Sequence, residues 1–177
     1  MIFHSCKLAG VYLIELTYFE DERGFFAPSF SRRVFEERGL TGDFVENNIS
    51  YNRRSGTLRG LHFQVAPYAQ AKLVRCTRGS IFDVAVDLRR DSPTFRQWVG
   101  HTLSSDNRLL MYIPGEMAHG FQTLEDDTEV FYQVSEIYQP NACAGLRWND
   151  PAFGIEWPLP DDPIILDRDS SYPDFGG

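Results

Sequence analysis

Turn residues divide this sequence into short apolar segments, and that division is the strongest constraint on its fold. Val, Ile, Phe, Tyr and Thr are common in these segments, as is typical of β-strands. The range 81–88 shows the pattern most clearly, because Phe, Val and Leu alternate there with Asp and Ala. A period of two places successive side chains on opposite faces of a strand. The pattern predicts an all-β protein.

The expected elements are many short strands and one helix. We expect strands at residues 11–19, 25–26, 73–77, 81–88, 98–103, 109–113, 120–124 and 128–137. The turn at 78–80 is expected to join its two flanking strands in a hairpin. Ser, Glu, Arg and a final Gly predict a short helix at 31–39, and the Pro-rich tail from residue 158 is expected to wrap the surface. Strands without a repeated sequence period favour a jelly roll or a related antiparallel barrel.

Composition limits the classes of protein and partner. The length of 177 residues and the 42% hydrophobic content predict one domain, 1–177, with a substantial core. The net charge of −8 disfavours nucleic acid and anionic membranes as partners. Three cysteines at unrelated spacings indicate a reducing cytoplasm rather than a disulfide framework. We expect neither a signal peptide nor a membrane span.

The segment 58–64 carries an arginine and a histidine inside an otherwise apolar strand. Strict alternation would send Arg59 and His62 to opposite faces of the sheet. Gly60 lies between them, and a bulge at this glycine would bring both side chains to a common cavity. The alternative is a hydrogen-bonded core histidine with no chemical role.

Three further residues have chemistry that a polar cavity could use. Lys72, one of only two lysines in the chain, opens a predicted strand, and the alternative for it is a solvent-facing position at the rim. His119 follows a turn-rich segment and could lie at a cavity mouth or simply bind a backbone group. Tyr132 is in phase with Val130 and Val134, so its ring should point inward, as either a core or a site tyrosine.

A metal site is not expected. The four histidines form no pair with the spacing of metal ligands, and no His-x-His motif occurs. We therefore expect a barrel that works with organic side chains and without a cofactor. Arg23 and the pair at 53–54 are interpreted as surface charges, with phosphate binding as the alternative.

Six ordered motifs together identify a family. They are Arg59-Gly-Leu-His-Phe-Gln64, Ala69-Gln-Ala-Lys-Leu-Val74, Phe82-Asp-Val-Ala-Val-Asp87, Ser92-Pro-Thr94, Ala118-His-Gly-Phe121 and Trp148-Asn-Asp-Pro151. In this order the chain resembles the dTDP-4-dehydrorhamnose 3,5-epimerase family from about residue 13 to residue 157. The resemblance implies a cupin-type antiparallel jelly roll with a few short peripheral helices, no cofactor, and a homodimer.

The resemblance also implies site residues. It implies that His62 is the general base, that Asp169 orients it, that Tyr132 is the acid from the other face, and that Lys72 lies near the sugar C4 oxygen. Further substrate contacts are implied for Arg59, His119, Arg23, Phe26, Glu46, Asn48 and Tyr138, with the arginine at position 23 supplied across a dimer.

Elementary chemistry agrees with the implied catalytic roles. Proton removal next to a ketone leaves negative charge on the ketone oxygen, and a nearby ammonium stabilises that charge. Histidine can be an unprotonated base at neutral pH, whereas tyrosine stays protonated and can act as an acid. A base on one face and an acid on the other are what inversion of a carbon requires.

The sequence departs from the family pattern at four positions. Pro28 stands where many relatives have glutamate and Glu46 where they often have glutamine, both at the base end of the nucleotide site. The nucleotide base therefore stays open. Gln133 replaces a frequent lysine and Cys143 a frequent glutamate.

The resulting hypothesis is an epimerase that inverts C3 and C5 of a nucleotide-linked 4-keto-6-deoxy sugar through an enolate. The first alternative is a mono-epimerase acting at C3 or C5 only, on the same or another nucleotide sugar. Two hypotheses from different classes also stay open, namely a metal-dependent cupin and a non-catalytic sugar-binding barrel.

Overall fold

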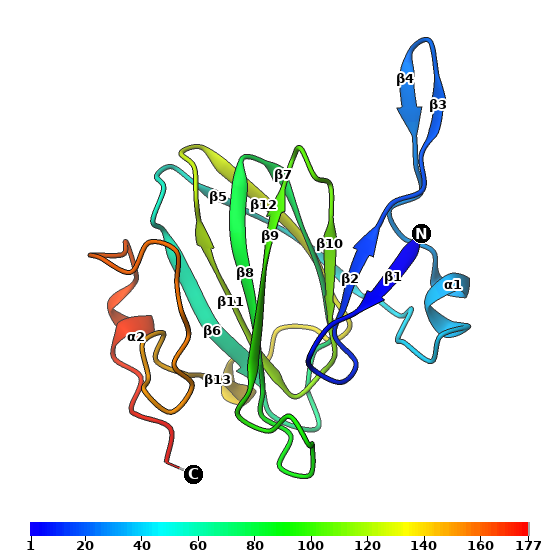
Figure 1. Cartoon of the computed structure of the whole chain (residues 1–177). Coiled ribbons are helices and arrows are strands. Elements are labelled where there is room, and N and C mark those ends of the chain that lie inside the picture. The colour runs from blue at the N-terminus through cyan, green and yellow to red at the C-terminus, as the bar shows by residue number, and fades with distance from the viewer. Residues whose placement is uncertain (177) are drawn as a thin grey trace.

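The computed structural model describes residues 1–176 and is built almost entirely from strands (Figure 1). In chain order the elements are β1 (Ile2–Ser5), β2 (Tyr12–Glu15), β3 (Phe19–Asp21), β4 (Gly24–Phe26), α1 (Arg32–Glu36), β5 (Glu46–Asn52), β6 (Leu58–Gln64), β7 (Lys72–Arg78), β8 (Ser80–Asp87), β9 (Trp98–Ser104), β10 (Leu110–Ile113), β11 (Met117–Thr123), β12 (Thr128–Val134), a 3-10 helix (Pro140–Ala142), β13 (Cys143–Gly145) and α2 (Asp167–Ser170).

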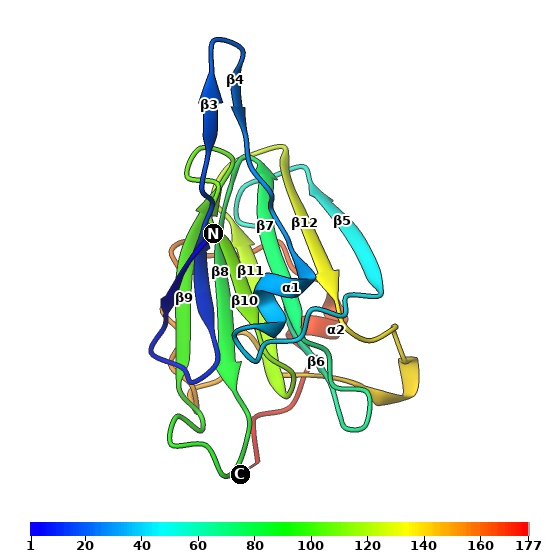
Figure 2. The ribbon, with the colours of Figure 1, turned by 90° about the vertical axis from the view of Figure 1, so that its right-hand side faces the viewer.

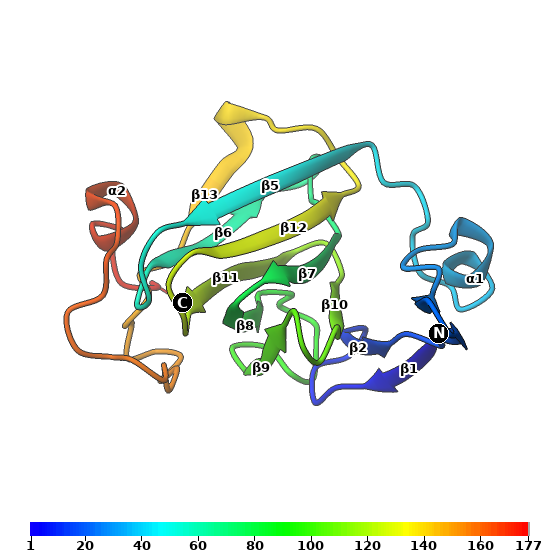
Figure 3. The same cartoon turned by 90° about the horizontal axis from the view of Figure 1, so that it is seen from above.

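Two large antiparallel sheets face each other across the main core. One has the order β1-β2-β10-β7-β12-β5 and the other the order β13-β6-β11-β8-β9. Seen from above, β5, β12 and β7 lie over β6, β11 and β8 (Figure 3). Inward side chains of both sheets, such as Val74, Ile81, Met111 and Val130, form a fully buried cluster between them. This arrangement confirms the predicted all-β jelly roll.

The predicted hairpin at residues 73–88 is wrong. Both strands exist, but β7 pairs with β10 and β12, whereas β8 pairs with β9 and β11. Gly79, at φ +74°, therefore carries the chain from one sheet to the other. Turn residues report that the chain reverses, but they do not report whether the two arms share hydrogen bonds.

Strand β8 is covered on both faces, so both sets of its alternating side chains are buried, each in a different cluster. Ile81 and Ala85 point into the core between the sheets, whereas Val84 and Val86 pack outward. The outward layer is covered by Leu146, Phe153 and Trp157, from the part of the chain drawn in orange in Figure 1. The acidic side chains of this strand are consequently buried as well.

The outer face of the six-stranded sheet is covered by the segment that contains α1. Leu73, Leu110 and Tyr112 pack there against Phe35. The helix predicted at 31–39 is confirmed but is shorter, and Gly39 follows it at φ +70°. The helix is thus a cover for one sheet rather than part of the cavity.

The strand expected at 11–19 is broken in two. The residues of β2 belong to the large sheet, but β3 pairs only with β4 in a separate hairpin. This hairpin projects away from the body (Figure 2). Phe19 and Phe26 are 62% and 68% exposed, so a large apolar surface lies outside the core of this chain.

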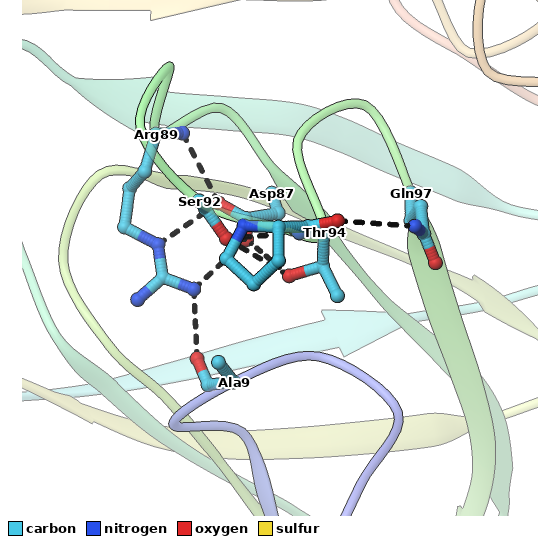
Figure 4. A network of polar contacts seen from close by, with 7 residues as sticks. Ala9, Asp87, Arg89, Ser92, Thr94 and Gln97 are labelled. Carbon is cyan, nitrogen blue, oxygen red and sulfur yellow. Dashed lines mark hydrogen bonds and ion pairs between the residues drawn. The ribbon is translucent and has the colours of Figure 1, made fainter.

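A buried carboxylate fixes the loop after β8 (Figure 4). The Asp87 carboxylate accepts hydrogen bonds from the hydroxyls of Ser92 and Thr94 at 2.5 and 2.6 Å. The Arg89 guanidinium donates two more at 2.9 Å and reaches the Ala9 carbonyl at 2.7 Å. Burial opposes ionisation of Asp87, but these donors together hold its pKa far below the ordinary value. Both carboxylate oxygens of Asp87 therefore accept hydrogen bonds that hold this loop in place.

The expected bulge at Gly60 is present. His119 pairs with His62 and Phe121 pairs with Arg59, so two residues of β6 oppose Gly120 alone. Because of this extra residue, Arg59 and His62 line the same cavity. Gly60 has φ +111°, and a Cβ there would lie 2.6 Å from the Gly120 Cα.

Replacing Gly120 with alanine is expected to destabilise the protein by about 1–3 kcal/mol, in the range of overpacking changes. The added Cβ would lie 2.6 Å from the Arg59 carbonyl oxygen, which is backbone and cannot turn away. Thermal unfolding measures the loss. Gly115→Ala is the control, because its nearest neighbour would be the Ala69 Cβ at an acceptable 3.4 Å. Equal melting temperatures for the two variants would contradict the tight crossing.

Within residues 1–176, none of the helices is long and apolar enough to cross a membrane.

Candidate active site

A cavity of about 220 Å³ lies between the two sheets. Both sheets and the C-terminal segment line it, through Ser50, Arg59, His62, Lys72, His119, Gly120, Phe121, Tyr132, Leu166, Arg168 and Asp169. A second hollow of about 170 Å³ shares His62, Lys72, Tyr132 and Arg168 with the first and extends to Tyr138 and Cys143. The shared side chains make the two hollows parts of one site.

His62 and Asp169 form a hydrogen-bonded pair at this site. His62 Nε2 lies 2.9 Å from Asp169 Oδ1, and Asp169 is only 2% exposed. Arg168 Nε donates to the same oxygen at 3.1 Å, and the Gly60 amide makes a long 3.5 Å contact with the other one. With Nε2 bonded to Asp169, Nδ1 is the ring nitrogen left to accept a proton.

The surroundings of this pair favour a neutral histidine and an ionised aspartate. Burial lowers the pKa of His62 below 6.5, although the bond to Asp169 opposes the shift. Burial opposes ionisation of Asp169, but bonds from His62 and Arg168 bring its pKa below the ordinary value. His62 is therefore an unprotonated base at neutral pH, which is the state that proton removal needs.

Lys72 is a buried cation. It is 8% exposed, and its Nζ donates to the His62 carbonyl at 3.2 Å, which leaves two of the three ammonium protons for a ligand. Burial lowers its pKa to about 8, against the opposing charge of Asp83. The rim position considered from the sequence is wrong.

Tyr132 faces the same cavity from β12. Its ring packs against the inter-sheet core, in phase with Val130 as expected. Burial raises the pKa of its phenol, Arg59 lowers it and Glu46 raises it again. The phenol consequently stays protonated at neutral pH and can donate a proton. On the neighbouring strand, the Ser50 hydroxyl lines the cavity and has no hydrogen-bond partner among residues 1–176.

Arg59 and His119 complete the polar wall. Arg59 Nε donates to Asn52 Oδ1 at 2.7 Å, which fixes the guanidinium at the edge of the cavity. His119 is 8% exposed, and its Nε2 lies 2.7 Å from Asp83 Oδ1. The site thus holds two His–Asp pairs, whose histidines lie directly opposite each other on the adjacent strands β6 and β11.

The structure brings some of the expected substrate contacts to the cavity and leaves others outside. Tyr138 lines the second hollow and is 55% exposed. Glu46 and Asn48 lie on β5, bonded to each other at 3.0 Å, near Tyr132 but outside the cavity lining. Arg23 and Phe26 do not reach the cavity of this chain, because both lie on the projecting β3–β4 hairpin.

Sequence reasoning missed Asp83, Arg168, Ser50 and Cys143 as parts of this site. An acidic residue facing the same way as the apolar Ile81 and Ala85 on a strand was the available signal for Asp83. Arg168 follows no local pattern, since only the path of the tail places it beside His62. Among residues 1–176, no group of three or more His, Cys, Asp or Glu side chains is arranged to hold a metal ion.

Comparison with known proteins identifies the family. Residues 5–176 match the family model described as dTDP-4-dehydrorhamnose 3,5-epimerase. The curated dTDP-4-dehydrorhamnose 3,5-epimerase of Pseudomonas aeruginosa is 48% identical over 163 residues, covering 92% of this chain and 89% of the relative.

Two solved structures are similar over nearly the whole chain. The dTDP-6-deoxy-D-glucose-3,5-epimerase of Legionella pneumophila, in complex with dTDP-4-keto-L-rhamnose, has a TM-score of 0.89 and 38% identity, covering 96% of this chain and 89% of that one. The 3'-monoepimerase ChmJ of Streptomyces bikiniensis, in complex with dTDP-quinovose, has a TM-score of 0.89 and 31% identity, covering 97% and 86%.

The fold and these matches define the class of protein as a carbohydrate epimerase, and therefore an isomerase, with a cupin-like jelly roll. More narrowly, the chain belongs to the dTDP-4-dehydrorhamnose 3,5-epimerase family.

Proposed function

We propose that this chain inverts both C3 and C5 of a dTDP-linked 4-keto-6-deoxy sugar, of the type that leads from dTDP-4-dehydro-6-deoxyglucose to dTDP-4-dehydrorhamnose. One observation supports this most directly. His62 comes from the five-stranded sheet and Tyr132 from the six-stranded sheet, and both line one cavity. A base and an acid on opposite walls can act on opposite faces of one sugar ring.

The proposed step begins with proton removal. His62 Nδ1 takes the proton from the carbon next to the C4 ketone, and the bonding electrons move to the ketone oxygen to give an enolate. Asp169 stabilises the imidazolium that forms, and the Lys72 ammonium stabilises the oxyanion. The Tyr132 phenol then gives its proton to the opposite face of the same carbon. His62 then releases its proton to solvent and the Tyr132 phenolate takes one up, which restores both groups before the same step at the second carbon completes the double inversion.

Cations in the cavity support an anionic substrate despite the net charge of −8. Arg59, Lys72 and Arg168 all line the cavity, and within residues 1–176 Arg168 alone of the three is ion-paired, with Asp169. Guanidinium groups at the mouth suit the diphosphate of a nucleotide sugar. The dTDP-sugar complexes of the two similar structures agree with this substrate class.

We propose a homodimer in which the β3–β4 hairpin enters the partner's site. The hairpin exposes Phe19, Phe25 and Phe26, and the Arg23 guanidinium is 84% exposed with Asp21 as its ion-pair partner at 2.5 Å. An apolar surface of this kind indicates an interface. Arg23 and Phe26 would then contact the nucleotide of the other protomer.

The three free cysteines support a reducing cytoplasm as the location, and residues 1–177 are proposed to act as one domain.

A mono-epimerase is the second candidate. The similarity to the 3'-monoepimerase ChmJ supports this candidate, because its TM-score of 0.89 equals that of the 3,5-epimerase of Legionella pneumophila. Proton NMR in heavy water separates the two. Deuterium entering at both C3 and C5, with inverted stereochemistry in the product, supports double inversion. Exchange at one carbon only would replace the proposal with the mono-epimerase.

Tyr132→Phe is expected to impair net inversion by about 100- to 10,000-fold while it affects proton removal far less, because it removes only the acid. The same NMR assay reads both quantities, as deuterium wash-in and as product formed. Tyr112→Phe is the matched control, since Tyr112 belongs to the same sheet but is buried on its outer face, away from the cavity. Equal losses of exchange and inversion in Tyr132→Phe would count against the assignment of the acid.

A further inference from the structure

Asp83 is a buried carboxylate that the proposed reaction leaves without a role. It is completely inaccessible to solvent and lies on β8, facing inward between the sheets. Oδ1 accepts the 2.7 Å bond from His119, whereas Oδ2 is buried with no hydrogen-bond partner among residues 1–176. A buried carboxylate oxygen without a donor is costly and needs a physical reason.

Asp87, on the same strand, shows what a structural carboxylate looks like in this fold. It is equally buried, but each of its oxygens accepts at least two hydrogen bonds (Figure 4). Asp83 makes one bond, and that bond goes to a side chain of the cavity wall. The difference indicates that Asp83 serves the cavity rather than the loop structure.

The titratable groups around Asp83 point the same way. The Asp83 charge acts on Lys72 and Cys76 of β7 and on His101 of β9, and Asp83 bonds His119 of β11. Burial lowers the pKa of Lys72, and the nearby Asp83 charge opposes that shift. Within the described residues the buried Lys72 ammonium bonds only the His62 carbonyl, so a fixed negative charge nearby favours its protonated form.

We propose that Asp83 is a positioning residue of the reaction: its carboxylate orients the His119 imidazole toward the cavity and places a fixed, buried negative charge behind the cavity wall as the counter-charge of the Lys72 ammonium. The inference rests on the proposed function, because in that reaction the Asp83 carboxylate serves to keep a cation, Lys72, next to the C4 oxygen. With Nε2 of His119 donating to Asp83, the Nδ1 atom of that ring is left for the substrate.

The test is Asp83→Asn, which keeps the size of the side chain and removes its charge. Without that charge the pKa of Lys72 falls below about 8, since Asp83 raises it in the wild-type protein. The alkaline limit of turnover should move to lower pH by about one unit. At neutral pH, kcat should fall by about 10- to 100-fold with a smaller change in KM, because a small displacement of His119 or Lys72 lowers the rate of the reaction more than the affinity for the substrate.

The lysine can also be observed without any assay of activity. The chain has only Lys7 and Lys72, so an NMR titration of labelled lysine side chains gives two signals, and exposed Lys7 is the internal reference. We expect the Lys72 signal to titrate near pH 8 in the wild type and at lower pH in Asp83→Asn. The smaller variant Asp83→Ser, measured in parallel, supplies the same reading if the asparagine variant does not fold.

Asp87→Asn is the matched control, as a loss of charge on the same buried strand away from the cavity. It should lower the melting temperature but leave the Lys72 titration and the alkaline limit of turnover unchanged. An unchanged Lys72 titration in Asp83→Asn and Asp83→Ser would overturn the inference. Failure of the proposed function is a separate result, because the wild-type protein would then exchange no deuterium into the sugar while the titration still reports on Asp83.

Discussion

His62→Ala is expected to abolish deuterium exchange at both C3 and C5, with a loss of about 100- to 10,000-fold or more, the usual contribution of a positioned base. The reason is geometric. His62 is a base held by a buried carboxylate at 2.9 Å, and burial keeps its pKa below 6.5. His119, the other histidine of the cavity, is tied to Asp83 on a different strand and cannot occupy the same place.

Proton NMR in heavy water measures this loss directly. His4→Ala is the control, because the His4 side chain is half exposed, lies at the edge of the six-stranded sheet and, among residues 1–176, has Glu15 as its only side-chain hydrogen-bond partner. A thermal melt establishes that His62→Ala is folded. Full turnover by a folded His62→Ala protein would refute the mechanism, and loss of exchange at one carbon only would require a second base for the other.

Lys72→Met is expected to reduce the rate of exchange at both carbons by about 100- to 1,000-fold, as happens when one group that stabilises an oxyanion is removed. Methionine fills a similar volume and carries no charge. The His62 carbonyl holds the ammonium within the cavity. Because the C4 oxygen becomes negatively charged as the enolate forms, its attraction to the ammonium is strongest at that stage. The loss should therefore appear in kcat more than in KM.

Lys7→Met is the matched control for this substitution. It removes the only other lysine, which is exposed and lies outside the cavity. Steady-state kinetics of both variants, together with the exchange assay, give the result. A Lys72→Met protein with wild-type kcat would show that the oxyanion is stabilised by another group, such as Arg59 or His119.

The parts of the fold that could be predicted depend on neighbours in the sequence. Alternation at 81–88 predicts β8, and the glycine between Arg59 and His62 predicts the bulge that brings these two side chains together. Both signals are local, because the pleat of a strand and the freedom of glycine act over two or three residues. The hairpin expected at 78–80 failed, since the pairing of β7 and β8 depends on the whole set of strands.

The site divides in the same way. His62 could be selected from the sequence because it interrupts an apolar strand, Lys72 because it is one of two lysines and opens a strand, and Tyr132 because it is in phase with Val130 and Val134. Asp169 came from the family resemblance. The burial of Lys72 and the pairing of Asp83 with His119 had no local signal.

The sequence by itself determined which segments are strands, where β6 bulges, and to which family the chain belongs. Only the tertiary structure decided that Arg168 lies in the cavity beside His62 and that Asp83 lies buried among Lys72, His101 and His119. The physical reason is that backbone preferences act between neighbours, whereas the charge state of a buried group depends on every side chain packed around it.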